Sequence, residues 1–149
     1  MPFPELQEIQ NIVASPMKRD EKLSAICLAL NRAVPYFNWV GFYITDDTKR
    51  ELVLGPFVGA PTEHLRIPFG RGICGRAADE LKTVIVQDVA QEENYLSCSI
   101  DVRSEIVVPV FKSGRLVAEL DIDSHVPSAF KTKDRAFLEE VCRIISSTF

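Results

Sequence analysis

The sequence predicts an α+β domain in which helices pack against one face of a central antiparallel sheet. Three observations carry this prediction: apolar residues recur with helical spacing at both ends of the chain, they alternate with a period of two between these ends, and the strand-like segments follow one another as hairpins. The pattern lacks the alternating strand–helix–strand units that a parallel sheet requires. With 149 residues and no linker or repeat, the chain fits a single domain, residues 1–149, with one core.

Helical spacing marks three segments. The first covers about residues 4–14. The second covers 20–34, with an aspartate at its start as a candidate N-cap and a proline just after its end. The last covers about 132–147. Cys27 and Cys142 lie within the apolar stripes of the second and last helices, so we interpret both as packing residues.

Strand-like alternation fills the middle of the chain. NWVGFYI (38–44) and RELVLGPFVG (50–59) form a first hairpin around a DDTK turn. Three glycines in IPFGRGICGRAADE (67–80) predict tight turns that lead into a short helix. TVIVQDV (83–89) is the next strand, and SEIVVPVFKSGRLVAELDIDS (104–124) is a second hairpin.

Composition excludes several classes of protein. With 46% hydrophobic and 26% charged residues, the chain is globular and not disordered. A net charge of −4 argues against binding to a nucleic-acid backbone. The sequence has no apolar run long enough to span a membrane and no export signal at its start, so we expect a cytoplasmic protein. Its four cysteines show no zinc spacing, and we predict reduced thiols and no metal.

The second hairpin carries an acidic face. In RLVAELDID (115–123) the even-numbered residues are all apolar and would pack on the helices. Because successive side chains of a strand point to opposite faces, Glu119, Asp121 and Asp123 then point to the other side of the sheet. One side of this strand is therefore core and the other is acidic.

The turn of the hairpin decides whether Glu105 joins this acidic face, because a shift of one residue reverses every side chain. A two-residue turn of Ser113 and Gly114 would put Glu105 on the opposite face, and that turn favours asparagine or aspartate at its first position. A three-residue loop with Gly114 in the left-handed conformation fits the sequence better. It sets Glu105 opposite Asp121, on the acidic face.

Clustered carboxylates repel one another, so the acidic face needs a cation or raised pKa values. A divalent metal, a basic side chain or the ammonium group of a small ligand would each satisfy it. If both hairpins share one sheet, Trp39 and Tyr43 lie on the acidic side with Gly41 leaving space between their rings, and this favours a small molecule with a cationic head and an apolar tail. The alternative is an ordinary solvated sheet face.

Cys98 differs from the packing cysteines. It lies in NYLSCSIDVRSEIVVPV (94–110), a polar stretch that becomes apolar only at the following strand, and it precedes Glu105 by seven residues. Structural thiols usually lie among apolar neighbours. A thiol in a polar loop ahead of an acidic face is a candidate reactive group.

These motifs, taken in order and spacing, resemble a GAF domain, and more narrowly the free methionine-(R)-sulfoxide reductase family. The resemblance covers about residues 20–147 and leaves 1–19 as an additional N-terminal helix. It rests on NWVGFYI, LVLGPFVG, RIPFGRGICG, QDV, SEIVVPV, LDIDS and AFKTKDRAFLEEV. The most specific of these is NWVGFY together with SEIVVP and a cysteine seven residues before its glutamate. The fold it implies is a GAF-like sheet with helices on one face and a ligand pocket on the other.

The resemblance implies a role for each matched residue. Cys98 stands at the position of the catalytic cysteine. Three acids, Glu105, Asp121 and Asp123, stand where the family binds the substrate ammonium and helps to protonate the sulfoxide oxygen. Trp39 and Tyr43 stand at the aromatic wall. The implied chemistry is thiol-dependent reduction of free methionine sulfoxide, with no bound cofactor and with thioredoxin or another thiol as external reductant.

The sequence departs from the family at its second thiol. Many members carry a resolving cysteine two residues before RIP, where this chain has His64. Cys74 matches a further cysteine of relatives and is a possible resolving thiol, although it also reads as a small buried residue. The loss of the usual cysteine leaves an alternative function, a non-catalytic GAF module that binds a small molecule as a sensor. The exposed first helix is compatible with a homodimer.

Overall fold

The computed structural model describes residues 3, 6–96 and 101–149. Its centre is a six-stranded antiparallel sheet with the strand order β3-β2-β1-β6-β5-β4. The strands are β1 (Trp39–Asp46), β2 (Glu51–Val58), β3 (Arg66–Pro68), β4 (Val84–Val86), β5 (Ser104–Lys112) and β6 (Arg115–Ser124). The helices are α1 (Leu6–Ala14), α2 (Arg19–Ala33), α3 (Gly72–Glu80) and α4 (Thr132–Ile145).

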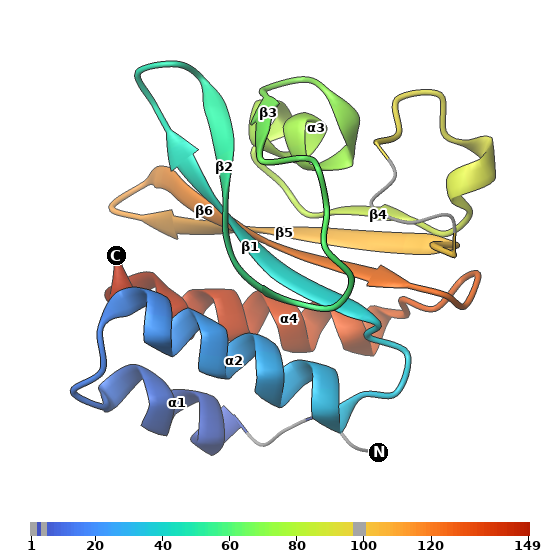
Figure 1. The fold of residues 1–149 in the computed structure, drawn as a ribbon. Helices are drawn as coiled ribbons and strands as arrows, with labels where there is room; N and C mark the ends of the chain where they lie inside the picture. The colour runs from blue at the N-terminus through green and yellow to red at the C-terminus, as the bar shows by residue number, and fades with distance from the viewer. Residues whose placement is uncertain (1–2, 4–5, 97–100) are drawn as a thin grey trace.

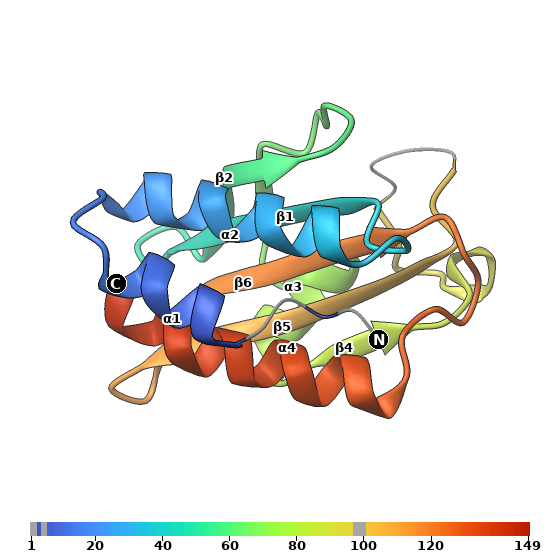
Figure 2. The same cartoon turned by 90° about the horizontal axis from the view of Figure 1, so that it is seen from below.

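The helices divide between the two faces of the sheet. Helices α1, α2 and α4 lie on one face, and α3 lies on the other together with the connections around it (Figure 1). Seen from below, α1 lies over α2 and α4 and contacts both of them (Figure 2). The predicted α+β class is therefore confirmed, with the packing helices on one face. None of the helices in the described part of the chain has the length and apolar character needed to cross a bilayer.

Local sequence explains most helix boundaries, with one correction. The N-cap of α2 is Lys18, and Asp20 lies inside the first turn of the helix. Glu21 takes the role of capping group, because its Oε1 accepts a hydrogen bond of 3.1 Å from the Lys18 backbone N–H. The helix ends at Ala33, shortly before the proline that prevents its continuation.

Two apolar clusters fill the two sides of the sheet. The larger one joins the inner faces of α1, α2 and α4 to the helix-facing residues of β1, β5 and β6. Cys27 and Cys142 lie in it, at 0% and 3% exposure, so their interpretation as packing residues is confirmed. Burial raises the pKa of both thiols, which makes them poor nucleophiles. The smaller cluster lies between the opposite face and α3, and it contains Cys74.

The turn predicted for the second hairpin is wrong, although the face predicted for Glu105 is right. Lys112 pairs with Arg115, so the turn has two residues, and both Ser113 and Gly114 adopt positive φ, 53° and 76°. An irregularity between Val110 and Phe111 then shifts the pairing by one residue. The bulge reverses the parity that the short turn would impose, so Glu105 faces the acidic side, opposite Asp123 and not Asp121.

Candidate active site

The acidic face is buried beneath α3. Strand β6 places Glu119, Asp121 and Asp123 on this side, and β5 adds Glu105. None of the four is more than 4% exposed, so the alternative of a solvated sheet face is excluded. Burial of this many carboxyl groups is costly unless each is protonated, hydrogen-bonded or matched by a cation.

Cys74 belongs to the same cluster. It lies in α3, is 4% exposed, and its Sγ lies within 4.8 Å of a carboxylate oxygen of Glu105 and of one of Asp121. The Cys74 thiol donates a hydrogen bond to Asp121, and the Glu105 carboxyl group shares a second hydrogen bond with Asp121. Three separate elements, α3, β5 and β6, therefore bring a thiol and two acids to one point.

The surroundings of the cluster favour protonated groups. Burial raises the pKa of Asp121, and the hydrogen bonds from Glu105 and Cys74 partly oppose this rise. Burial, and then the charge of Asp121, raises the pKa of Glu119. Burial also raises the pKa of the Cys74 thiol, and the carboxylates of Asp121, Glu105 and Glu119 raise it further. The site can therefore store protons at carboxyl groups that are ionised in water.

Glu119 differs from its neighbours in its hydrogen bonding. It is 0% exposed, and neither of its carboxylate oxygens has a hydrogen-bond partner among the described residues. It lies on the acidic face opposite Tyr43 of β1. The charge of Asp121 acts on it, and its own charge acts on Cys74. A buried carboxyl group without a partner is costly, so its retention in the site calls for a functional reason.

Two aromatic rings form a second wall of the site. Trp39 and Tyr43 of β1 lie on the acidic face, in register with Asp123 and Glu119 of β6. The Trp39 indole N–H donates a hydrogen bond of 2.9 Å to the Ala60 carbonyl. The Tyr43 hydroxyl donates one of 3.0 Å to the backbone carbonyl of His64. The position that replaces the family's usual cysteine thus supports the aromatic wall through its backbone.

Gly41 has a narrower role than the one predicted for it. A Cβ atom at this position would lie 2.4 Å from Cη2 of Trp39 and 2.8 Å from Cβ of Phe57. The space above Gly41 is therefore filled by the Trp39 ring itself, which stacks on Phe57 with ring centroids 5.4 Å apart. The glycine lets the indole lie flat against the sheet.

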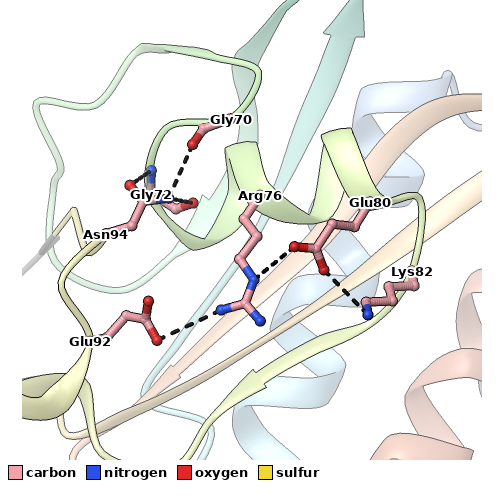
Figure 3. A network of polar contacts seen from close by, with 7 residues as sticks. All are labelled: Gly70, Gly72, Arg76, Glu80, Lys82, Glu92 and Asn94. Carbon is pink, nitrogen blue, oxygen red and sulfur yellow. Dashed lines mark hydrogen bonds and ion pairs between the residues drawn. The ribbon is translucent and has the colours of Figure 1, made fainter.

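The segment before residues 97–100 is fastened to the start of α3. Asn94 accepts a hydrogen bond of 2.8 Å from the Gly72 N–H and donates one of 3.0 Å to the Gly70 carbonyl (Figure 3). Gly72 adopts a φ of +66°, and a Cβ atom there would lie 2.9 Å from Cγ of Leu96. Glycine at position 72 therefore permits the positive φ and leaves the space that Leu96 occupies.

Ion pairs and backbone contacts support the same region. Arg76 of α3 contacts Glu80 at 3.1 Å and Glu92 at 3.7 Å, and this pair of contacts links the helix to the segment that precedes Asn94 (Figure 3). After residue 100, the Arg103 N–H donates a hydrogen bond of 2.8 Å to the Ser124 carbonyl. The chain on both sides of residues 97–100 is therefore held to the frame of the site.

Comparison with known proteins agrees with this arrangement. A GAF domain family model matches residues 17–149. The chain is 36% identical to GAF domain-containing protein A of Dictyostelium discoideum, over 95% of this chain and 88% of that protein. It superposes with a TM-score of 0.91 on free methionine-R-sulfoxide reductase from Neisseria meningitidis in complex with its substrate, at 40% identity and over 97% of this chain and 85% of that one. The chain belongs to the GAF-domain family, in its free methionine-R-sulfoxide reductase branch.

A second solved reductase supports the same branch. The fRMsr of Staphylococcus aureus, in complex with substrate, superposes with a TM-score of 0.86 at 35% identity, over 95% of this chain and 91% of that chain. The resemblance read from the sequence motifs is therefore confirmed, and so is the GAF-like fold.

Five of the residues that the motifs assign to the reductase site share one buried face, as predicted: Trp39, Tyr43, Glu105, Asp121 and Asp123. Cys98 lies outside the described residues. The sequence did not indicate the contact of Cys74 with the acids, because the two segments are distant in the chain. The role of Asn94 was also missed, and the paired glycines at 70 and 72 were the only local signal of a close approach.

Proposed function

We propose that this chain reduces free methionine-R-sulfoxide to methionine, with the Cys98 thiol as the reacting group. The juxtaposition of buried carboxyl groups and two aromatic rings on one face of the sheet supports this function best. An anionic wall beside an apolar wall suits an amino acid with a free ammonium group and an apolar side chain. Relatives from Neisseria meningitidis and Staphylococcus aureus that superpose closely on this chain carry the same activity in their names.

Substrate binding is assigned to residues of three strands. Glu105, Asp121 and Asp123 hold the substrate ammonium, which supplies the cation that a cluster of buried acids requires. Trp39 and Tyr43 bound the space for the methyl and methylene groups. A protein-bound methionine has no free ammonium group, so this assignment also explains selection of the free amino acid.

The chemical step joins the thiol to the sulfoxide. The Cys98 sulfur attacks the sulfoxide sulfur while a neutral carboxyl group of the site protonates the oxygen. The sulfur–oxygen bond of the substrate then breaks, the hydroxyl group passes to the cysteine sulfur, and methionine leaves. The substrate sulfur gains two electrons and the cysteine sulfur loses two, so the enzyme is left as a sulfenic acid. Buried acids with raised pKa values, among them Asp121, suit proton delivery at neutral pH.

The sulfenic acid must then be resolved. Cys74 is the candidate within the chain: its thiol displaces water from Cys98 to form a disulfide, which thioredoxin or another external thiol reduces. Only the thiolate attacks, and the pKa of Cys74 is raised. Asp121, which already accepts the Cys74 hydrogen bond, is the base placed to take its proton. An external thiol acting directly on Cys98 is the other route. No bound cofactor enters either route.

A single-turnover experiment tests the proposal. Pre-reduced protein is mixed with free L-methionine-R-sulfoxide in the absence of reductant, and methionine and the state of each thiol are measured by mass spectrometry. We expect one methionine per chain and oxidation at Cys98. The Cys98→Ser variant should lose turnover completely, whereas Cys142→Ala, which changes a buried thiol on the opposite face, should keep it.

Each outcome separates the alternatives. Full turnover by Cys98→Ser would exclude the assignment of the reacting thiol. Binding of methionine sulfoxide without any turnover in the unmodified protein would establish the sensor function instead. A disulfide that joins Cys98 to Cys74 would identify the resolving thiol, and its absence would leave resolution to the external thiol.

A further inference from the structure

The contacts of Cys74 suggest a second ligand for the acidic site. The ligand atoms of Cys74, Glu105 and Asp121 all lie within 4.8 Å of one another, and all three residues are buried. A thiol and two carboxyl groups at such separations are a donor set for a metal ion. The sequence showed no metal spacing because these donors come from α3, β5 and β6 and meet only in the fold.

A second observation points independently to a missing cation. Neither carboxylate oxygen of the fully buried Glu119 has a hydrogen-bond partner among the described residues, and Oδ1 of Asp121 also has none there. Glu119 lies two residues before Asp121 in β6, so its carboxyl group is on the same side of the sheet as the donor set. A divalent cation would satisfy unpartnered carboxyl oxygens on the side of the sheet that carries a thiol, since it replaces their protons.

We propose that Zn²⁺ binds in the reduced protein through Cys74 Sγ and one carboxylate oxygen each of Glu105 and Asp121, with the Glu119 carboxyl group on the same face of the sheet as balancing charge. A thiolate in the donor set selects a borderline-soft ion, whereas Mg²⁺ and Ca²⁺ prefer all-oxygen sites. Tetrahedral zinc sets its sulfur and oxygen ligands about 3.5 Å apart. Sulfur–oxygen separations of at most 4.8 Å must therefore shorten by no more than about 1.3 Å for these atoms to bind one ion.

Zinc at this site would regulate the reductase. Glu105 and Asp121 are also the acids assigned to the substrate ammonium, so zinc and methionine sulfoxide compete for them. Zinc also holds the Cys74 thiolate and withholds it from disulfide formation. These consequences rest on the proposed function, whereas zinc binding itself does not.

Metal titration of the tag-free, reduced protein tests the site without an activity assay. Zn²⁺ affinity is measured against a competing chelator, and Co²⁺ in place of Zn²⁺ reports a cysteine ligand through a thiolate-to-cobalt charge-transfer band. We expect one ion per chain and a charge-transfer band. Cys74→Ala should abolish the band and weaken zinc binding by more than about 100-fold, since it removes a ligand. The matched thiol variant Cys142→Ala should change neither.

Two further variants make the assignment specific. Cys98→Ser should retain the band and the affinity, because Cys98 is not in the donor set. Glu119→Gln, which keeps the size of the side chain, should retain the band and weaken binding by about 10-fold to 100-fold. Loss of the band in Cys98→Ser with retention in Cys74→Ala would overturn the proposal, and so would the absence of a stoichiometric ion in the unmodified protein. Zinc binding by a protein that shows no sulfoxide turnover would leave this site established and the reductase function excluded.

Discussion

The two faces of the central sheet are built from alternate residues of the same strands, yet they serve opposite purposes. On the helix-covered face, β6 contributes Ala118, Leu120 and Ile122 to a continuous apolar core. On the α3 face, the residues between them are the acids Glu119, Asp121 and Asp123, which are buried just as completely. Burial of the apolar β6 side chains therefore stabilises the fold on the helix-covered face, whereas burial of the β6 acids opposes it on the α3 face.

This difference indicates that the acidic face lowers the stability of the fold, and that the site is built at this cost. Apolar burial contributes about 25 cal/mol per Å², whereas a buried polar group without a partner costs about 1–3 kcal/mol. The helix-covered core must therefore offset the cost of the acidic face. A ligand that brings positive charge, an ammonium group or a metal ion, would recover part of that cost only when it binds.

Substitution of Leu120 is expected to have the largest effect on stability, and it tests whether the two faces are independent. It is 0% exposed in the helix-covered core, and Leu120→Ala should lower the free energy of unfolding by about 2–5 kcal/mol through lost burial and the cavity left behind. Because its side chain points away from the acids, the affinity for methionine sulfoxide should stay within a factor of about two of the unmodified protein in the same buffer. Urea unfolding and ligand titration measure the two quantities. A loss of affinity as large as the loss of stability would show that the faces are not independent.

Glu119, the neighbour of Leu120 in β6, provides the opposite test. Burial and the charge of Asp121 raise the pKa of Glu119 above its ordinary value of 4.5. As pH rises above 4.5, the unfolded chain loses this proton while the folded chain keeps it, so the folded state loses stability. Glu119→Gln cannot lose a proton. We expect it to be more stable than the unmodified protein at pH 7, by about 1–3 kcal/mol, and equal to it near pH 4.

Urea unfolding across this pH range, with a chelator present to exclude metal, measures the gap between Glu119→Gln and the unmodified protein. Glu140→Gln, a change at a half-exposed helix position paired with Arg143, is the control and should show no such gap. A constant difference at all pH values would mean that Glu119 does not hold a proton in the folded state.

The division into two faces could be predicted from the sequence because it depends only on the period of two. The alternation in RLVAELDID assigns each residue to a face whatever the strand pairs with. The partners across the hairpin could not be predicted in this way. The two-residue Ser113–Gly114 turn and the bulge at Val110 each shift the register by one residue from the one predicted. The sequence disfavoured the first and gave no signal of the second.

The contacts within the site were harder to predict than the face of the sheet on which the site lies. The family motifs named the acids and the aromatic rings, but the position of Cys74 against Glu105 depends on how α3 docks onto the sheet. That docking rests on contacts between segments distant in the chain, such as Asn94 with Gly72. Strand β3 was also missed, because three residues that end in a proline carry no alternation.

Substitution of Asn94 is expected to have the smallest effect on stability, and it tests directly how the site is positioned. Its side chain joins the segment that precedes Cys98 to Gly70 and Gly72 at the start of α3 (Figure 3). Asn94→Ala should cost about 1 kcal/mol of stability, the typical net value of exposed hydrogen bonds. If the contact positions the reacting thiol, kcat should fall by at least about tenfold while KM changes little, since the acids that bind the ammonium are untouched.

The control is Arg76→Ala, which removes the neighbouring ion pairs and should leave kcat nearly unchanged. Equal and small effects of both variants on kcat would show that the loop is placed by the rest of the α3 face, and that Asn94 contributes stability alone.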